Sequence, residues 1–296
     1  MPSLPTNFGL LEGAYCDYDR SRVVVLPVPF ERTTTYGKGT SLGPAAIIRA
    51  SQSMELYDEE LESEPFDQGI ATLPPFLPES FDMAAALAEI EREASRHFAQ
   101  GKFLVTVGGE HSLSLAPVRA ARAAHGVIGV VQFDAHADLR EDFEGTSYSH
   151  ASVMKRIADD GFPTLGVGLR SLSTPEADLI RRQERPVIWG HQLDRAAEAF
   201  PQLLGLLPRK VYLTFDVDFF DPALVPATGT PEPGGGWWYP TLALLRTLFA
   251  AKTVVGMDLV ELAPLGNQPA SDFLAAKLIY KCLGYLQESE SGHVLH

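Results

Sequence analysis

Cysteine and long apolar runs are scarce in this sequence, and each shortage excludes a class of protein. The 296 residues include two cysteines, Cys16 and Cys282, which lie far apart. Small secreted domains stabilised by disulfides are therefore excluded, and a reducing compartment is expected. No apolar run is long enough to span a bilayer, and residues 1–18 lack the basic start and apolar core of a signal peptide. We therefore expect a cytoplasmic protein that makes no membrane contact.

Basic residues are also in deficit. The chain has 24 Lys and Arg against 38 Asp and Glu, a formal net charge of −14. Such a balance disfavours nucleic acid as a partner and is compatible with a cationic small-molecule substrate. Hydrophobic residues make up 45% of the chain, which is enough to bury a sizeable core.

Short apolar runs alternate with amphipathic stretches along most of the chain. Strands are predicted at residues 22–28, 69–73, 103–107, 127–133, 164–168, 187–189, 211–215 and 254–257. Helices are predicted at residues 43–54, 81–100 (with Ser80 as the N-cap), 112–125, 151–160 and 271–287, with further helical stretches between the later strands. This alternation predicts an α/β fold, with helices on both faces of a mostly parallel sheet of about eight strands.

The chain shows no internal repeat, linker or break in composition. We therefore predict one three-layer αβα domain over residues 1–296. Residues 1–20 and 289–296 are predicted to be peripheral or mobile.

Asp134, His136 and Asp138 follow the apolar run at 127–133 and alternate with alanines. Side chains at i, i+2 and i+4 of an extended segment point the same way. Two buried carboxylates beside one imidazole need a cation to hold them together. Metal binding is therefore the leading interpretation of this segment.

Other predicted strands are also followed by potential ligands. This is expected, because α/β folds with parallel sheets bind ligands at the carboxyl ends of their strands. Glu261 follows the last predicted strand, and six further side chains lie after three others: His111, Asp134, His136, Asp138, Asp216 and Asp218. Four carboxylates with two imidazoles exceed a single zinc site and favour two harder ions such as Mn²⁺. Such a pair lowers the pKa of a shared water.

Seven segments together resemble the ureohydrolases, the family of arginases and agmatinases, and agmatinases most of all. They are residues 36–44, 55–61, 108–112, 134–138, 216–222, 227–232 and 256–261. The resemblance runs from about residue 23 to 286. It implies an arginase-like fold, two Mn²⁺ per subunit (with Ni²⁺ or Co²⁺ also fitting such ligands) and assembly into homo-oligomers, either trimers or hexamers.

The resemblance also implies roles for individual residues. His111, Asp134, Asp138 and Asp216 match ligands of one ion or of both, while His136 and Asp218 complete the second ion's site. A hydroxide bridging the ions then attacks the guanidinium carbon. Glu261 matches the carboxylate that binds the substrate guanidinium, and Thr230 matches a position lining that pocket. His150 matches a histidine that moves protons or stabilises the leaving group, although Ala151 stands where many agmatinases have glycine. Asp138 is the nearest donor of a proton to the departing amine.

The loop after Asp138 bears on the substrate. Arg140 stands where arginases carry an asparagine that binds the substrate's α-carboxylate and α-amine, so arginine is disfavoured. Arg140 could bind a carboxylate, as in guanidinobutyrate or formiminoglutamate, but Glu141, Asp142 and Glu144 make the loop acidic and favour a distal ammonium. The sequence therefore predicts that agmatine and water give putrescine and urea, with N1-aminopropylagmatine as the alternative substrate.

Two other classes of protein stay open. A metal-dependent deacetylase on a related fold would not need His136 and Asp218, and a non-catalytic paralogue would not need all six ligands and Glu261. The aromatic pair Trp237-Trp238 follows three glycines. These tryptophans fit a substrate channel and core or subunit packing equally well.

Overall fold

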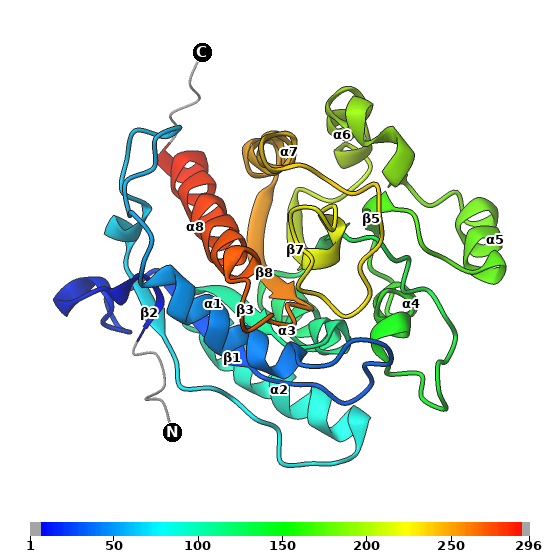
Figure 1. Cartoon of the computed structure of the whole chain (residues 1–296), viewed down its shortest axis with the longest axis horizontal. Helices are drawn as coiled ribbons and strands as arrows, with labels where there is room; N and C mark the ends of the chain where they lie inside the picture. The colour runs from blue at the N-terminus through cyan, green and yellow to red at the C-terminus, as the bar shows by residue number, and fades with distance from the viewer. Residues whose placement is uncertain (1–6, 292–296) are drawn as a thin grey trace.

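Eight parallel strands form a single sheet at the centre of the molecule (Figure 1). The computed structural model describes residues 7–291. The strands are β1 (Val23–Val28), β2 (Ile70–Thr72), β3 (Phe103–Gly108), β4 (Gly129–Phe133), β5 (Thr164–Leu169), β6 (Val187–Trp189), β7 (Lys210–Asp216) and β8 (Thr253–Val260). They lie in the order β2-β1-β3-β8-β7-β4-β5-β6. The prediction of an αβα fold with a mostly parallel sheet of about eight strands is confirmed.

Helices cover both faces of this sheet (Figure 1). They are α1 (Gly43–Ser51), α2 (Met83–Phe98), α3 (Leu115–His125), α4 (Val153–Asp159), α5 (Thr174–Arg182), α6 (Ala196–Leu204), α7 (Trp238–Ala251) and α8 (Ala270–Ser291). α1, α6, α7 and α8 contribute to one apolar core, and α2, α3, α4 and α5 to the other. Successive side chains of β1 alternate between them, Val23 and Val25 in the first, Val24 and Leu26 in the second. Both faces of the strand are therefore buried, which explains its uninterrupted apolar sequence.

Short 3-10 helices connect the main elements: η1 (Phe8–Leu10), η2 (Gly13–Tyr15), η3 (Thr40–Leu42), η4 (Pro65–Gln68), η5 (His111–Ser114), η6 (His150–Ser152), η7 (Gly190–Arg195) and η8 (Val217–Phe219). The helices predicted to begin at Ser112 and Ala151 instead start as η5 and η6 and become α-helical one turn later. The prediction that Ser80 caps α2 is wrong. Asp82 is the N-cap, and its carboxylate accepts a hydrogen bond from the backbone N–H of Ala85.

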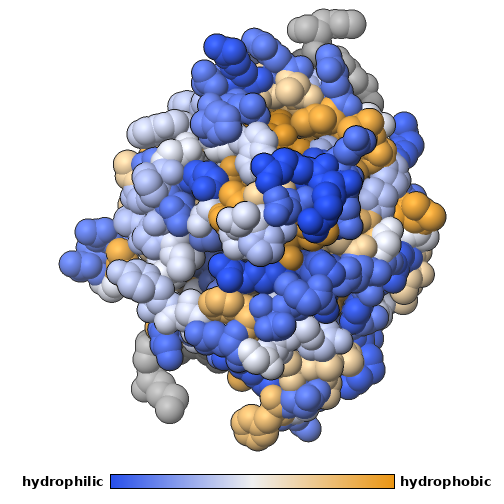
Figure 2. Space-filling model, turned by 90° about the vertical axis from the view of Figure 1, so that its right-hand side faces the viewer, coloured by the Kyte–Doolittle hydropathy of each residue, from blue (hydrophilic) through white to orange (hydrophobic). Residues whose placement is uncertain are grey.

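The first described residues contact the core, because Phe8 is completely buried within the first apolar cluster. Residues 1–6 and 292–296, which fall within the segments predicted to be peripheral or mobile, lie outside the described residues. Among the helices within residues 7–291, none is long and apolar enough to cross a membrane. The face shown in Figure 2 is mostly hydrophilic, with small apolar patches between polar side chains.

The sheet topology brings four predicted clusters together. β8 and β7 lie between β3 and β4, so the carboxyl ends of β3, β8, β7 and β4 are neighbours. A ligand site is expected where the strand order reverses in this way. His111, Asp134, Asp216 and Glu261 lie at these four strand ends or directly after them.

Candidate metal centre

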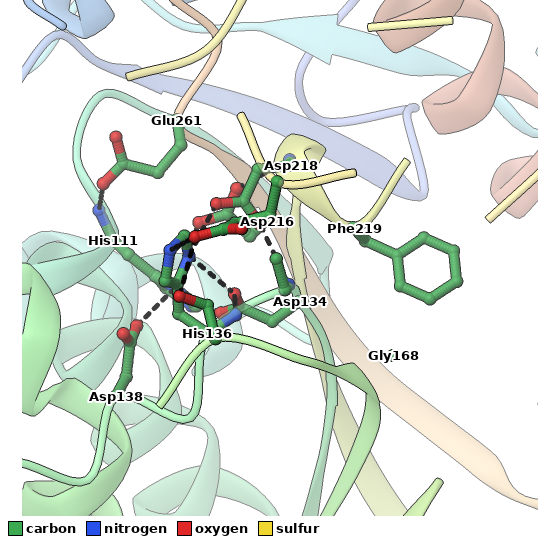
Figure 3. A network of polar contacts seen from close by, with 12 residues as sticks. His111, Asp134, His136, Asp138, Gly168, Asp216, Asp218, Phe219 and Glu261 are labelled. Atoms are coloured by element: carbon green, nitrogen blue, oxygen red, sulfur yellow. Dashed lines mark hydrogen bonds and ion pairs between the residues drawn. The ribbon is translucent and has the colours of Figure 1, made fainter. Parts of the chain in front are cut away.

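Two groups of metal-ligating side chains lie at this edge of the sheet and share Asp134 (Figure 3). One consists of His111, Asp134 and Asp216, and the other of Asp134, His136 and Asp218. Asp134 offers one oxygen to each group, since its Oδ2 is 3.1 Å from His111 Nδ1 and its Oδ1 is 3.7 Å from His136 Nδ1. The arrangement suits two ions side by side.

The remaining predicted ligands lie against the same two histidines. Asp138 Oδ2 and Asp216 Oδ2 are 3.1 and 3.5 Å from His111 Nδ1. Asp218 Oδ2 is 2.8 Å from His136 Nδ1. All six side chains predicted as ligands therefore meet in one place. His111 Nδ1 lies among the carboxylates of one group, and His136 Nδ1 lies among those of the other.

The segment after β4 positions its three candidate ligands, Asp134, His136 and Asp138, through unusual backbone geometry. His136 pairs with Ser171, which follows β5, in an isolated bridge that continues the sheet past β4. Asp138 then adopts φ +51°, a left-handed conformation that non-glycine residues rarely adopt. Glu261, at the end of β8, has φ +65°. Strained residues of this kind concentrate at functional sites.

The segment carrying Asp216 and Asp218 is fixed by close packing. Asp216 Oδ1 accepts a hydrogen bond of 2.8 Å from the backbone N–H of Asp218 at the start of η8. Next to Asp218, the Phe219 ring packs so closely on Gly168 that a Cβ there would lie 2.6 Å from it (Figure 3). Gly168 also has φ +94°. Glycine is therefore required at this position for the Asp218 segment to pack as it does.

A hydrogen-bond chain behind His111 determines which ring nitrogen faces the carboxylates. His111 Nε2 lies 2.9 Å from Thr214 Oγ1, and Thr214 Oγ1 donates to Asp258 Oδ1 at 2.7 Å. Because the Thr214 hydroxyl has one proton and donates it to Asp258, its oxygen accepts the Nε2 proton of His111. Neutral His111 therefore directs an Nδ1 lone pair at Asp134, Asp138 and Asp216.

That lone pair is the structural reason for a cation at this site. His111 Nδ1 is buried and makes no hydrogen bond among the described residues. A lone pair surrounded by carboxylate oxygens is repelled unless a positive charge lies between them. The nitrogen and carboxylate oxygens present fit divalent transition-metal ions.

The pKa values of the metal-free protein show the same excess of negative charge. Burial, together with the neighbouring carboxylates of Asp138 and Asp218, raises the pKa of Asp134 to about 7. Burial opposes a charged imidazole at His136, but the Asp218 carboxylate outweighs this effect and the pKa of His136 rises to about 11. Burial also raises the pKa of Asp216 well above its ordinary value. Without metal, protons occupy the place of the cations.

A cavity of about 360 Å³ opens onto this centre, and Glu261, Thr230 and His150 line it. Glu261 Oε1 accepts a hydrogen bond of 2.6 Å from the backbone N–H of His111. Burial raises the pKa of Glu261 well above its ordinary value, which the His111 N–H only partly offsets. Within residues 7–291, the second oxygen of Glu261 accepts no hydrogen bond, so a guanidinium brought to this buried carboxylate could bind to it.

His150 lies at the edge of this cavity. Its Nδ1 is 3.1 Å from Thr33 Oγ1, its backbone N–H donates to the same oxygen at 3.0 Å, and its ring meets the edge of Phe143. Thr33 is held in turn by Glu110, which is completely buried and accepts hydrogen bonds from the backbone N–H and the hydroxyl of Thr33. His150 is thus oriented from a segment more than 100 residues away.

The sequence did not identify several of these supporting residues. Thr214 gives no local signal, because its partners lie 44 and 103 residues away along the chain. Glu110 belongs to the segment 108–112, but its contacts with Arg32 and Thr33 join residues 77 to 78 positions apart. Strand periodicity does place Thr214 on the same face as Asp216. The tryptophan pair considered for a substrate channel does not line this cavity. Trp238 packs on Phe220, and Trp237 is exposed.

Comparisons with known proteins agree over nearly the whole chain. The profile of the arginase family matches residues 21–284. A relative from Synechocystis sp. named N(1)-aminopropylagmatine ureohydrolase is 42% identical over 284 residues, covering 94% of this chain and 93% of the relative. An agmatinase from Pyrococcus horikoshii is 33% identical over 264 residues, covering 88% and 90%. The solved agmatine ureohydrolase of Thermoplasma volcanium matches with a TM-score of 0.87 and 29% identity, covering 99% of this chain and 97% of that one.

Proposed function

Because this chain belongs to the arginase family of metal-dependent ureohydrolases, we propose that it releases urea from N1-aminopropylagmatine. Removal of the guanidino carbon and two nitrogens as urea leaves the triamine spermidine. The observation that carries the reaction class is the pair of His/Asp groups sharing Asp134 beside the buried carboxylate of Glu261.

The choice of substrate rests on the relatives. The sequence alone favours agmatine and keeps N1-aminopropylagmatine as the alternative. The relative that shares 42% of its residues with this chain is named for the longer substrate, whereas the agmatinase shares 33%. We therefore place N1-aminopropylagmatine first. Agmatine is the second candidate, supported by the match to a solved agmatine ureohydrolase.

We propose that the six predicted side chains bind two Mn²⁺ ions: His111, Asp134, His136, Asp138, Asp216 and Asp218. Two divalent ions at this site supply the Lewis acidity that activates water near neutral pH. Asp134 is well placed to contact both ions, because its two oxygens face different histidines. Gln132 Nε2 donates to Asp134 Oδ2 at 2.8 Å and fixes that carboxylate's orientation.

The other cavity residues bind and orient the substrate in this proposal. Glu261 forms a charge-assisted pair with the guanidinium, and Thr230 lines the same pocket. Asp138 transfers a proton to the departing amine, and His150 exchanges protons with solvent at the edge of the cavity. A cytoplasmic location stays a prediction. Assembly into a homotrimer or homohexamer is also a prediction, and light scattering would test it.

Urea release is the direct test. Protein loaded with Mn²⁺ is incubated with N1-aminopropylagmatine, agmatine, arginine and guanidinobutyrate, and formamide release is measured with formiminoglutamate. We expect the highest kcat/KM for N1-aminopropylagmatine, then agmatine, and little turnover of the three carboxylate-bearing substrates. A clear preference for agmatine would reverse the order of the two candidates. Absence of product from every compound would contradict the proposed function.

A further inference from the structure

Within the part of the chain that the structure describes, one carboxylate in the cavity, Glu232, uses only one of its oxygens in a hydrogen bond. The cavity contains two carboxylates besides Glu261 and the metal-ligating residues, namely Glu176 and Glu232. Glu176 is buried and accepts hydrogen bonds from the backbone N–H groups of Leu139 and Ser173 and from the Ser173 hydroxyl. Glu232 accepts one hydrogen bond, from Ser171 Oγ to its Oε1 at 2.8 Å, and its side chain is 37% exposed.

We propose that Glu232 binds the nitrogen four carbons beyond the guanidinium, and so selects substrates with a cation there. In agmatine this nitrogen is the terminal ammonium, and in N1-aminopropylagmatine it is the secondary ammonium within the tail. The proposal rests on the proposed function and adds the residue that recognises the tail.

The backbone around Glu232 is held in place. The Arg170 guanidinium donates hydrogen bonds to the carbonyl oxygens of Glu232, at 2.7 Å, and of Pro233, at 3.0 Å. Ser171, which holds Oε1, is fixed by its own backbone N–H bond to Ala135. Glu232 therefore presents its second oxygen from a fixed position, which favours specific recognition over loose attraction.

The position of Glu232 is compatible with the length of the substrate. Gly229 lies next to Glu261, whose Oε2 would be 3.9 Å from a Cβ at this glycine. Two residues, Thr230 and Pro231, separate Gly229 from Glu232, so the Cα atoms of these two residues lie at most about 11 Å apart. A guanidinium carbon and an amine joined by one nitrogen and four carbons lie about 7 Å apart when extended. One substrate can therefore contact Glu261 and Glu232 together, with Thr230 between them.

The acidic loop that the sequence favours for this task points elsewhere. Glu141 is 71% exposed and pairs with Lys155 and Arg156, and neither it nor the exposed Glu144 lines the cavity. Arg140 does line the cavity, but its guanidinium lies over Phe143 and 4.0 Å from Glu176. Its positive charge is thus offset. Arg170 also attracts Glu232, but its hydrogen bonds go to backbone carbonyl oxygens, so the second oxygen of Glu232 stays available to the tail.

Glu232→Gln tests this proposal, because the amide keeps an oxygen for Ser171 and removes the charge. Steady-state kinetics are measured with agmatine, N1-aminopropylagmatine and butylguanidine, which lacks the amine. We expect kcat/KM for the two amines to fall about tenfold to hundredfold, as for loss of a charge-assisted hydrogen bond, with butylguanidine changed less than threefold. Glu144→Gln, which removes the same charge from the exposed loop, should leave all three values unchanged.

Two measurements separate this effect from other causes. Metal content must stay at the wild-type value, because Glu232 Oε1 is 4.0 Å from His136 Nε2. Calorimetric binding of spermidine, which needs no turnover, should weaken about tenfold or more in Glu232→Gln. Equal losses for butylguanidine and the amines, a loss in Glu144→Gln instead, or unchanged spermidine binding would overturn the proposal. If wild type turned over none of the substrates but Glu232→Gln still bound spermidine more weakly, as predicted, only the proposed function would be contradicted.

Discussion

Replacing Thr214 with valine tests the hydrogen-bond chain behind the metal centre. Valine keeps the shape of threonine but removes the oxygen that lies 2.9 Å from His111 Nε2 and 2.7 Å from Asp258 Oδ1. All three residues are completely or almost completely buried, so water cannot replace the lost partner. Leaving a buried donor and a buried carboxylate oxygen unsatisfied costs about 1–3 kcal/mol each, so we expect the metal-free protein to lose roughly 2–6 kcal/mol of unfolding free energy.

The effect on metal binding is the sharper part of this prediction. Without Thr214 the proton of neutral His111 is free to move to Nδ1, the nitrogen that faces the carboxylates. Loss of a group that orients a ligand histidine lowers metal affinity about tenfold to hundredfold. Competition titration with a chromophoric chelator measures the Mn²⁺ affinity of the folded protein directly, and thermal unfolding measures the stability.

Two further variants separate orientation from general damage. Thr214→Ser keeps the hydroxyl and should bind Mn²⁺ within about threefold of wild type. Asp258→Asn keeps the shape but can donate to Thr214, which turns the threonine hydroxyl toward Nε2 and places the proton on Nδ1. We expect this variant to bind Mn²⁺ as weakly as Thr214→Val. Wild-type affinity in Thr214→Val, or a serine variant as weak as the valine variant, would refute the reasoning.

Three other predictions follow from the same contacts. Glu261→Gln should lower kcat/KM for both amine substrates about hundredfold by removing the charge that binds the guanidinium, with metal content unchanged; a loss below threefold would contradict this role. Gly168→Ala should lower the unfolding free energy by about 2–4 kcal/mol, because the methyl group meets Phe219 at a left-handed φ, whereas Gly266→Ala, which has open space, should be nearly neutral. Metal-free protein should melt at lower temperature as pH rises from 5 to 8. The pKa is raised to about 7 at Asp134 and to about 11 at His136. Over this pH range the folded chain therefore holds more protons than the unfolded chain, and raising the pH destabilises it. Melting curves in chelator at several pH values check this slope, and a melting temperature that rises over the same range would show that these protons are absent.

The strands, and the convergence of His and Asp side chains at their ends, could be predicted from the sequence because their signals are local. A strand such as β4, buried on both faces, reads as a continuous apolar run, and the ligands follow directly where it ends. Sequence alone does not place the N-cap of α2, because Ser80 and Asp82 are both good capping residues. In the fold, Asp82 accepts the hydrogen bond from Ala85. Thr214, Arg170 and Glu232 gave no comparable signal, since their functional partners lie about 40 to 100 residues away and meet them only after folding.

The loop at residues 140–145 also shows that the sequence does not reveal where a charged side chain points. Glu141 looked suited to a cationic tail, because a sequence shows its charge but not its direction. In the fold Glu141 pairs with Lys155 and Arg156 at the surface. Glu232, whose only sequence signal is its place in the segment 227–232, lines the cavity. Composition therefore favours a cationic substrate but does not indicate which carboxylate is in place to bind it.

The central claim is that two ions lie side by side at the strand ends and that both are needed to release urea. Metal content per chain, measured together with urea release in wild type and His136→Ala, tests it most directly. We predict two Mn²⁺ per wild-type chain, and about one in His136→Ala with most of the activity lost, because His136 is the imidazole of the second ion's group. Two retained ions with full activity in His136→Ala would contradict the account.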